Sequence, residues 1–257
     1  MILRRLTSSL KEQHWTTIVI ELLIVIIGVF IGTQVSNWNE GRIEKQQTVR
    51  MLQQLDPELK LQMDSFASVK RYYGIAQRYA DVALAGWRGD PRVSDEQFVI
   101  SAYQASQVDG IGVNAQNLTL IFGGDKLRNI DDAVLRRHVA DVLTTDYSDV
   151  QLATMQTAYR TDVRLVIPND IQQQIRASCG DRLVRDAADQ YVYVLPEQCN
   201  LRLDKAESAT VAHTLRTHAS LEPELALHLS SVTAYLENVD YIEFPMRTLE
   251  RDLDRLM

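Results

Sequence analysis

The sequence predicts a mainly α-helical protein: an N-terminal transmembrane helix that continues into a stalk, then a helical bundle-like domain with at most one small β-hairpin. A single apolar run of bilayer length lies near the N-terminus, and apolar residues recur at helical spacing along most of the remaining chain. Only 11 Gly and 6 Pro occur in 257 residues, which argues against a loop-rich β-sandwich. We expect four parts: a cytoplasmic tail or interfacial helix (1–14), a transmembrane signal anchor (15–38), a helical stalk (39–90) and a helical extracytoplasmic domain (91–257).

The overall composition excludes several other classes of protein. Hydrophobic residues make up 46% of the chain and its net charge is −7, values typical of a folded protein rather than a disordered one. The negative charge speaks against a nucleic-acid partner. Two cysteines are too few for a disulfide scaffold or a four-cysteine zinc site.

The apolar run extends from Thr16 to Val35, and Glu21 is its only charged residue. Twenty helical residues span about 30 Å, the thickness of the bilayer core. Trp15 and Trp38 bracket the run, where their amphipathic rings would lie at the two interfaces. A buried core helix is the alternative, as is a cleaved signal peptide. No small-x-small cleavage site follows the run, so we predict an uncleaved signal anchor and a lipid bilayer as partner.

The basic residues on either side of this anchor do not decide its orientation, because their numbers are equal. Three basic residues precede the span and three follow it closely: Arg4, Arg5, Lys11 and Arg42, Lys45, Arg50. The first 13 residues also carry three leucines at helical spacing, which predicts a short interfacial helix or, alternatively, a frayed terminus. A short tail is easily retained while a long domain is exported. We therefore expect a cytoplasmic N-terminus and an external C-terminal domain.

One face of the predicted span is patterned. At 100° per residue, Thr17, Gly28 and Gly32 all fall within about 40° of Glu21. The Gly-x-x-x-Gly spacing lets a second helix approach closely, and a carboxylate at this depth needs a partner or a proton. The face is therefore expected to pack against a second copy of the chain or another membrane helix. The alternative is an isolated glutamate reaching for the interface beside incidental glycines.

The stretch ELLIVIIGVFIGTQVSNWNEGR, residues 21–42, resembles the opening signature of a bacterial family of uncharacterised single-span proteins. In that family a glutamate-led apolar helix ends in a Gln-x-x-Asn-Trp-Asn-Glu motif, matched here by Gln34, Asn37, Trp38, Asn39 and Glu40. A looser similarity covers residues 123–143, so the two segments together span about 43 of the 257 residues. The resemblance implies a membrane-anchored, largely helical protein and no particular reaction, because the family is a domain of unknown function. With the orientation given above, we expect a protein of the bacterial inner membrane whose C-terminal domain is periplasmic.

After the span the helix is expected to continue. Apolar residues recur every three, four or seven positions from Leu52 to Tyr73, with a kink or fresh start at Pro57. The cluster of glycine and proline at 86–91 should end this stalk, and Ser94 with Gln97 forms a capping box for a helix reaching about residue 107. Residues 108–129 are predicted to be a connecting loop rather than a phosphate-binding loop.

The distal half should contain further helices and one weak pair of strands. Helices are expected from 130 to about 165, from Pro168 until Gly180, from 204 to 218, and from 220 onward with a kink at Pro245. Residues 191–195 are the best strand candidate, with 200–203 as a possible partner. Cys179 and Cys199 would close a loop of about 20 residues if bridged, contributing about 3 kcal/mol, and an even cysteine pair suits an oxidising compartment. The alternative is two unrelated buried thiols.

No recognisable catalytic, cofactor or metal motif occurs, and no small-molecule ligand can be identified. The five histidines do not form a metal-binding pair at a productive spacing: His14, His138, His213, His218 and His228. Two classes of function stay open: a non-enzymatic protein-interaction or assembly module of the cell envelope, and a membrane-tethered, hydrolase-like enzyme built from dispersed residues. A deep pocket holding His138 or His213 beside carboxylates would favour the enzyme.

Overall fold

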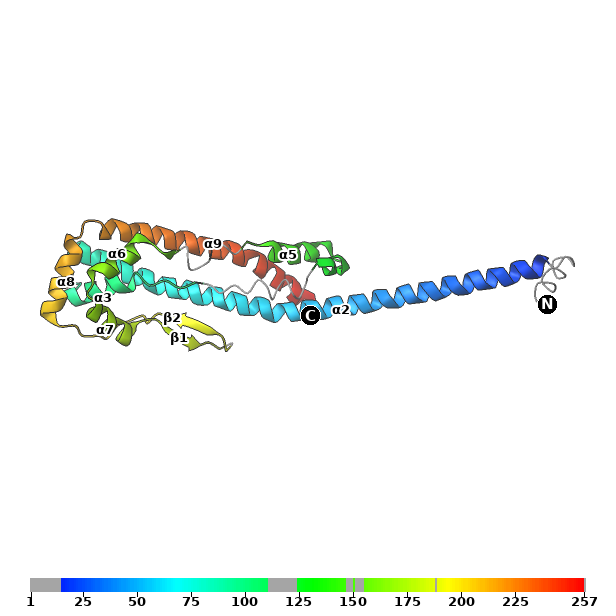
Figure 1. Ribbon diagram of the computed structural model, residues 1–257, viewed down its shortest axis with the longest axis horizontal. Helices are drawn as coiled ribbons and strands as arrows, with labels where there is room; N and C mark the ends of the chain where they lie inside the picture. Colours follow the sequence, from blue (N-terminus) through cyan, green and yellow to red (C-terminus); the bar gives the residue numbers. More distant parts are fainter. Residues whose placement is uncertain (1–14, 111–123, 147–149, 151–154, 188, 257) are drawn as a thin grey trace, which may run out of the picture.

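The computed structural model describes residues 15–110, 124–146, 150, 155–187 and 189–256. Within these ranges the chain forms seven α-helices, one short 3-10 helix and a two-stranded sheet (Figure 1). This confirms the mainly helical fold with one small hairpin. The predicted interfacial helix in residues 1–14 and most of the loop at 108–129 lie outside the described residues.

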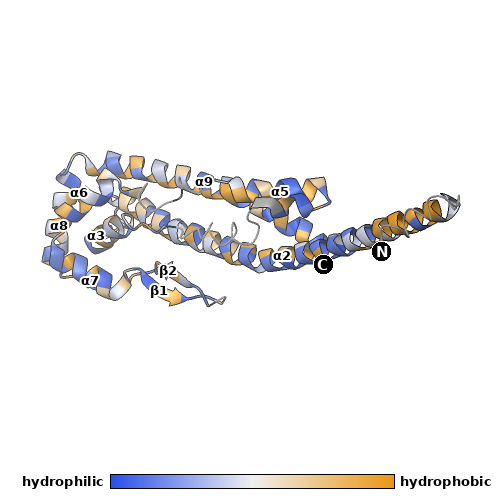
Figure 2. Cartoon of the chain, turned by 45° about the vertical axis from the view of Figure 1, so that its right-hand side comes forward, coloured by the Kyte–Doolittle hydropathy of each residue, from blue (hydrophilic) through white to orange (hydrophobic). Residues whose placement is uncertain are grey.

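One helix, α2 (Trp15–Trp87), runs through the predicted span and the predicted stalk without a break. At 1.5 Å per residue its 73 residues are about 110 Å long. Its first third is apolar and stands away from the rest of the molecule (Figures 1 and 2). Thr48 is the first buried residue, and from Leu55 onward the helix contributes one face to the core. The same helix is therefore both stalk and core element.

The second long helix, α9 (Leu221–Leu256), returns beside α2 in the opposite direction (Figure 1). One apolar face of α9 is buried against α2 and the shorter helices. The two buried stripes contain mostly aliphatic and aromatic residues at intervals of four or seven positions: Leu55, Leu59, Phe66, Tyr73 and Ala80 on α2; Leu225, Val232, Val239, Met246 and Leu253 on α9.

Polar contacts fix the register of these two helices. Lys70 on α2 binds Asp240 and Glu243 on α9, and Glu243 also accepts from Arg247 at 2.8 Å. Glu243 is only 4% exposed, so it depends on its cationic partners to offset the cost of burial.

Neither internal proline ends a helix. Pro57 lies inside α2 and Pro245 inside α9, so the predicted fresh start at Pro57 is wrong. Proline costs one backbone hydrogen bond in a helix interior. The buried leucines on either side of Pro57, Leu55 and Leu59, hold the turn in place by packing.

The end of the domain away from the span is closed by short helices. The breaker cluster ends α2 at Trp87, as predicted, and Gly89 there has a φ of 72°. The predicted capping box of Ser94 and Gln97 is present and opens α3 (Asp95–Gln104). Gly86 allows α3 to pack closely, because a Cβ at this position would lie 2.3 Å from Phe98 Cδ2.

Two shorter helices replace the single one predicted from residue 130 to about 165. Asp132 caps α5 (Ala133–Thr144), preceded by the 3-10 helix η1 (Gly124–Asn129), and α6 (Ala158–Val166) starts later. Helix α5 ends at Thr144, because the next residue, Thr145, has an extended backbone (ψ 133°). Amphipathic periodicity continues on both sides of this break, so periodicity alone did not reveal it.

The remaining elements follow the predicted boundaries closely. Pro168 precedes α7 (Asn169–Cys179), and Asp204 caps α8 (Lys205–Thr217) through the amides of residues 206 and 207.

The hairpin pairs β1 (Arg182–Arg185) with β2 (Tyr191–Val194) in antiparallel register, Arg182 opposite Val194. The prediction that residues 200–203 form the partner strand is wrong. That segment instead lies against the start of α3, where the Leu203 amide donates to Glu96 Oε2 at 2.9 Å.

Candidate functional site

The first candidate site is the patterned face of the apolar part of α2. Glu21 lies in a fully exposed stretch of this helix, and a Cβ added at Gly28 or Gly32 would meet no atom within 4 Å. Trp15 and Trp38 are also exposed, about 34 Å apart along the helix axis. Thr17 belongs to the helix, but its side chain lies outside the described part of the chain.

This apolar stretch is the one helix within the described residues that is long and apolar enough to cross a membrane. Its most hydrophobic window has a mean hydropathy of 2.5 and is not buried anywhere in the molecule. A core helix of a soluble domain would bury these side chains. The face of Glu21, Gly28 and Gly32 is therefore free to contact lipid or another helix.

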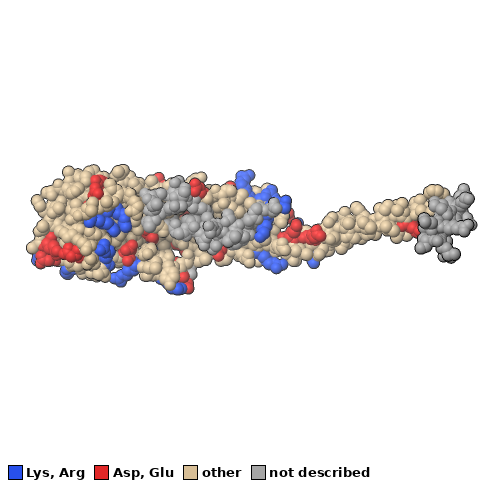
Figure 3. All heavy atoms as spheres, in the orientation of Figure 1, with Lys and Arg blue, Asp and Glu red and all other residues tan. Residues whose placement is uncertain are grey.

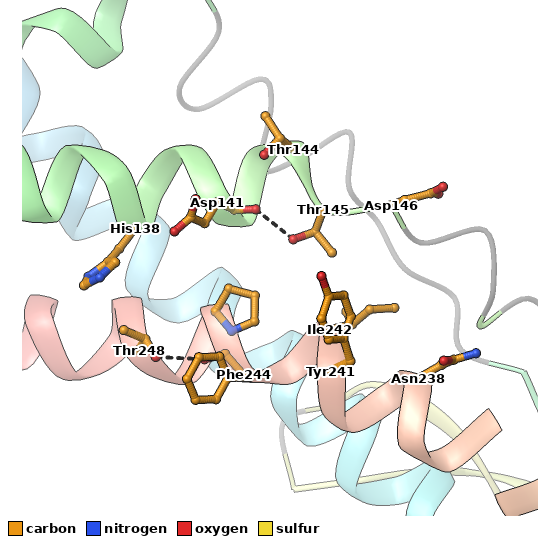
Figure 4. A pocket seen from close by; sticks show the side chains of 11 residues that line it. His138, Asp141, Thr144, Thr145, Asp146, Asn238, Tyr241, Ile242, Phe244 and Thr248 are labelled. Carbon is orange, nitrogen blue, oxygen red and sulfur yellow. Dashed lines mark hydrogen bonds between the residues drawn. The ribbon is translucent and has the colours of Figure 1, made fainter. Parts of the chain in front are cut away.

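The second candidate site is a groove of about 590 Å³ between α5 and α9 (Figure 4). His138 on α5 lies at one end, with Asp141 one turn further along the same helix. His138 Nδ1 is 2.5 Å from Asp252 Oδ2, which orients the imidazole ring. The exposed rings of Tyr241 and Phe244 lie along the α9 side.

The threonine hydroxyl groups that line this groove donate to carbonyl groups of their own helices. Thr145 Oγ1 donates to the Asp141 carbonyl at 2.7 Å, and Thr248 Oγ1 donates to the Phe244 carbonyl at 3.0 Å (Figure 4). Thr144 makes the same contact one turn back at 2.9 Å. Nucleophilic catalysis needs a hydroxyl or thiol bonded to the base. His138 thus has an orienting carboxylate, but these three hydroxyls are directed away from it.

The other described histidines differ in surroundings. His213 and His218 are exposed on and after α8. His228 on α9 is 1% exposed, with Thr157 Oγ1 2.8 Å from its Nδ1 and the ring of Tyr159 beside it. Burial lowers the pKa of His228 to about 4, so its ring is neutral at physiological pH. Among the described residues, no group of three His, Cys, Asp or Glu side chains is placed to hold a metal ion.

A third region, which the sequence did not indicate, is a polar network in the distal half of the bundle. The Tyr73 hydroxyl donates to the Asp109 carbonyl at 2.6 Å, and the Tyr72 hydroxyl donates to Asp181 Oδ2 at 3.3 Å. Burial, and then the charge of Asp181, raise the pKa of Asp109 to about 6. Burial also lowers the pKa of nearby Arg160. Shifted pKa values of this kind gather at functional sites as well as in structural networks.

The network was not predicted because its members come from four separate segments. One feature of the sequence could have drawn attention to this region. Arg160 is followed four residues later by Arg164, which places two like charges one helical turn apart.

Cys179 and Cys199 form a disulfide in the structure, with Cα atoms 5.3 Å apart. It joins the end of α7 to the segment after β2, so the hairpin lies inside the closed loop. The two sulfurs are therefore not available as nucleophiles.

These features define a mainly helical protein with one candidate membrane anchor near its N-terminus. The chain matches no family model, no curated protein and no solved structure among those with which it was compared. Its resemblance to the single-span bacterial family stays a prediction.

Proposed function

We propose that the chain is a single-pass protein of the bacterial inner membrane that presents a helical interaction module to the periplasm. The observation that supports this most strongly is the continuity of α2. A single helix passes from a fully exposed apolar stretch into the buried core, so the anchor and the domain form one element. A flexible linker would uncouple the two parts, whereas this helix fixes the domain relative to the membrane.

The geometry indicates how far such a domain reaches. From Trp38, the outer interface anchor, to Thr48, the first buried position, is about 15 Å. Lys45 binds Asp131 at 2.8 Å, which attaches the start of α5 to the helix at this level. From Trp38 to the end of α2 at Trp87 is about 74 Å. The module is therefore a rod that extends well beyond the lipid headgroups.

The disulfide supports the proposed orientation. Disulfides persist in oxidising compartments such as the periplasm and are rare in the cytosol. The charge of the domain has a separate consequence: residues 41–257 carry 24 basic and 31 acidic residues, an imbalance that favours solubility and keeps the domain away from anionic lipid.

Protease accessibility tests this orientation. In spheroplasts, added protease is expected to digest the domain while a cytoplasmic marker stays intact, and peptide mapping without reductant should recover the linked Cys179 and Cys199 peptides. A domain protected until the membrane is lysed, with both thiols free, would refute the proposed orientation.

The face of Glu21, Gly28 and Gly32 is the proposed contact with a partner helix, either a second copy or another membrane protein. Its support is that small residues and a carboxyl lie together on an exposed apolar helix. We expect Glu21→Leu combined with Gly32→Ile to abolish cross-linking in membranes. Leu23→Phe, which adds bulk on the opposite face, is the matched control and should leave cross-linking unchanged. Equal cross-linking in both variants would exclude this face.

A membrane-tethered hydrolase is the second candidate function. It is favoured by the pairing of His138 with Asp252 in an open groove that Asp141 also lines. Purified protein would be assayed on a panel of ester, phosphoester and amide substrates, with His138→Gln as the control. Turnover that disappears in His138→Gln would support the enzyme. Turnover that persists in the variant, or none on any substrate, would exclude a role for this groove in hydrolysis.

A further inference from the structure

Three arginines converge on the last turn of α3, at the end of the domain away from the apolar span. Arg160 and Arg164 lie one turn apart on α6, and Arg176 lies in the last turn of α7. Arg160 donates to the Ser106 carbonyl, and Arg164 Nε donates to Ser106 Oγ at 3.2 Å. Arg164 also stacks over the Tyr103 ring at 4.9 Å, and Arg176 donates to the hydroxyl of the same tyrosine at 3.2 Å.

The groups that accept from these arginines are uncharged. Besides Ser106 and Tyr103, the amide oxygen of Gln107 accepts from Arg164 at 2.8 Å. A guanidinium carries five N–H donors, and each of these arginines uses one or two of them in bonds to described residues. Within the described ranges, no carboxylate lies within the 4.0 Å ion-pair distance of any of the three, whereas Arg78 and Arg216 each have one. Most of the donors thus have no partner among the described residues.

The cluster is more than a helix cap. Basic side chains do stabilise the C-terminus of a helix, and Arg160 lies there, donating to the Ser106 carbonyl two residues after the end of α3. One cation is enough for that role, while a second at a spacing of four residues adds repulsion. Arg160 and Arg164 are also half-buried, and the repulsion from Arg164 adds to burial in lowering the pKa of Arg160. The arrangement concentrates positive charge in a domain that is acidic overall. Figure 3 shows that Lys and Arg side chains gather in patches on the face of the domain in view.

We propose that Arg160, Arg164 and Arg176 bind a small oxyanion, a phosphate group carried by a soluble molecule of the compartment that the domain faces. Planar guanidinium groups match the oxygens of phosphate in pairs, and unused donors on three converging side chains suit its tetrahedral oxygens. The charge of Asp181 acts on Arg160 from another element, and Asp109 lies beside Tyr73 in the adjoining network. These two carboxylates leave the cluster with a positive excess that a phosphate would balance.

Inorganic phosphate is the probe for this site. The full chain in detergent would be titrated by calorimetry with phosphate and with acetate, at constant ionic strength set by chloride, and its thermal unfolding followed in parallel. We expect saturable phosphate binding, a rise in Tm with phosphate, and at least tenfold weaker binding of acetate. Absence of saturable phosphate binding would overturn the proposal, and acetate binding of equal strength would overturn the assignment to phosphate.

Variants separate binding from capping. Arg164→Gln is expected to weaken phosphate binding at least tenfold, and Arg176→Gln, at an exposed position where folding is not at risk, should do the same. Arg78→Gln is the matched control, since Arg78 pairs with Glu197 outside the cluster at 3.1 Å and its loss should leave binding unchanged. If the arginines only cap α3, the variants will lower the Tm without phosphate and keep the wild-type response to it, and the proposal is then wrong.

Discussion

The buried histidine on α9 makes stability depend on pH in a way that can be calculated. His228 is 1% exposed, and burial lowers its pKa to about 4 from an unfolded value of about 6.5. Because the unfolded chain then binds the proton more tightly, stability falls as the pH drops below 6.5 and continues to fall until about 4. Relative to neutral pH, this protonation lowers the free energy of unfolding by about 1.4 kcal/mol at pH 5.5 and by about 2.5 kcal/mol at pH 4.5.

The perturbation that isolates this effect is His228→Asn. Asparagine is polar and does not titrate, and its amide replaces the ring nitrogen that contacts Thr157 Oγ1 at 2.8 Å. We expect the variant to be less stable than wild type at pH 7.5, because it loses the ring packing against Tyr159.

The assay is thermal unfolding of both proteins in the same detergent at pH 7.5, 5.5 and 4.5, followed by circular dichroism. The Tm difference between wild type and variant should shrink by roughly 5–10 °C between pH 7.5 and 4.5, since a protein of this size shifts about 2–4 °C per kcal/mol. A difference that stays constant over this range would show that His228 is solvated or protonated in the folded state and would refute the reasoning.

Three further predictions follow from single positions. Gly86→Ala should destabilise the protein by about 1–3 kcal/mol, because the added Cβ would lie 2.3 Å from a side-chain atom of buried Phe98. Gly74→Ala is the control: its Cβ would meet no atom within 4 Å, so the Tm of thermal unfolding should stay the same or rise. Asp109→Asn should raise the Tm at pH 7.5 and not at pH 4, because the raised pKa of Asp109 means that its ionised form is the costly one above about pH 6. Replacing Cys179 and Cys199 together with serine should cost about 3 kcal/mol, and an unchanged Tm would show that the bridge does not form.

Sequence patterns predicted the elements whose causes are local. The breaker cluster ended α2 at Trp87, Ser94 with Gln97 capped α3, and Pro168 with Gly180 bounded α7. Each of these signals depends on backbone conformation or on hydrogen bonds within four residues, so it can be recognised without knowing what packs nearby.

Tertiary packing decided the elements that were predicted wrongly. At Pro57 a new helix was expected, but the helix continues because buried leucines on either side of the proline hold it in place by packing. The strand at 191–194 pairs with 182–185, a segment whose four exposed residues lack the alternation of a half-buried strand. The neighbouring disulfide closes the loop in which the two strands meet.

The candidate sites divide in the same way. The apolar face of Glu21, Gly28 and Gly32 follows from helical spacing alone. The groove beside His138 and the arginine cluster need residues from separate helices, His138 with Asp252 and Arg164 with Tyr103. Sequence spacing cannot bring such pairs together.

The central claim is that one uninterrupted helix carries both the membrane anchor and the core of the domain. The most direct test is an electron spin resonance distance between labels at Arg42→Cys and Ala67→Cys, two exposed positions on either side of Pro57, in lipid nanodiscs with the native disulfide intact. A continuous helix predicts a single narrow distribution consistent with a backbone separation of about 38 Å. A broad distribution, or a clearly shorter distance, would show that anchor and domain are joined by a hinge.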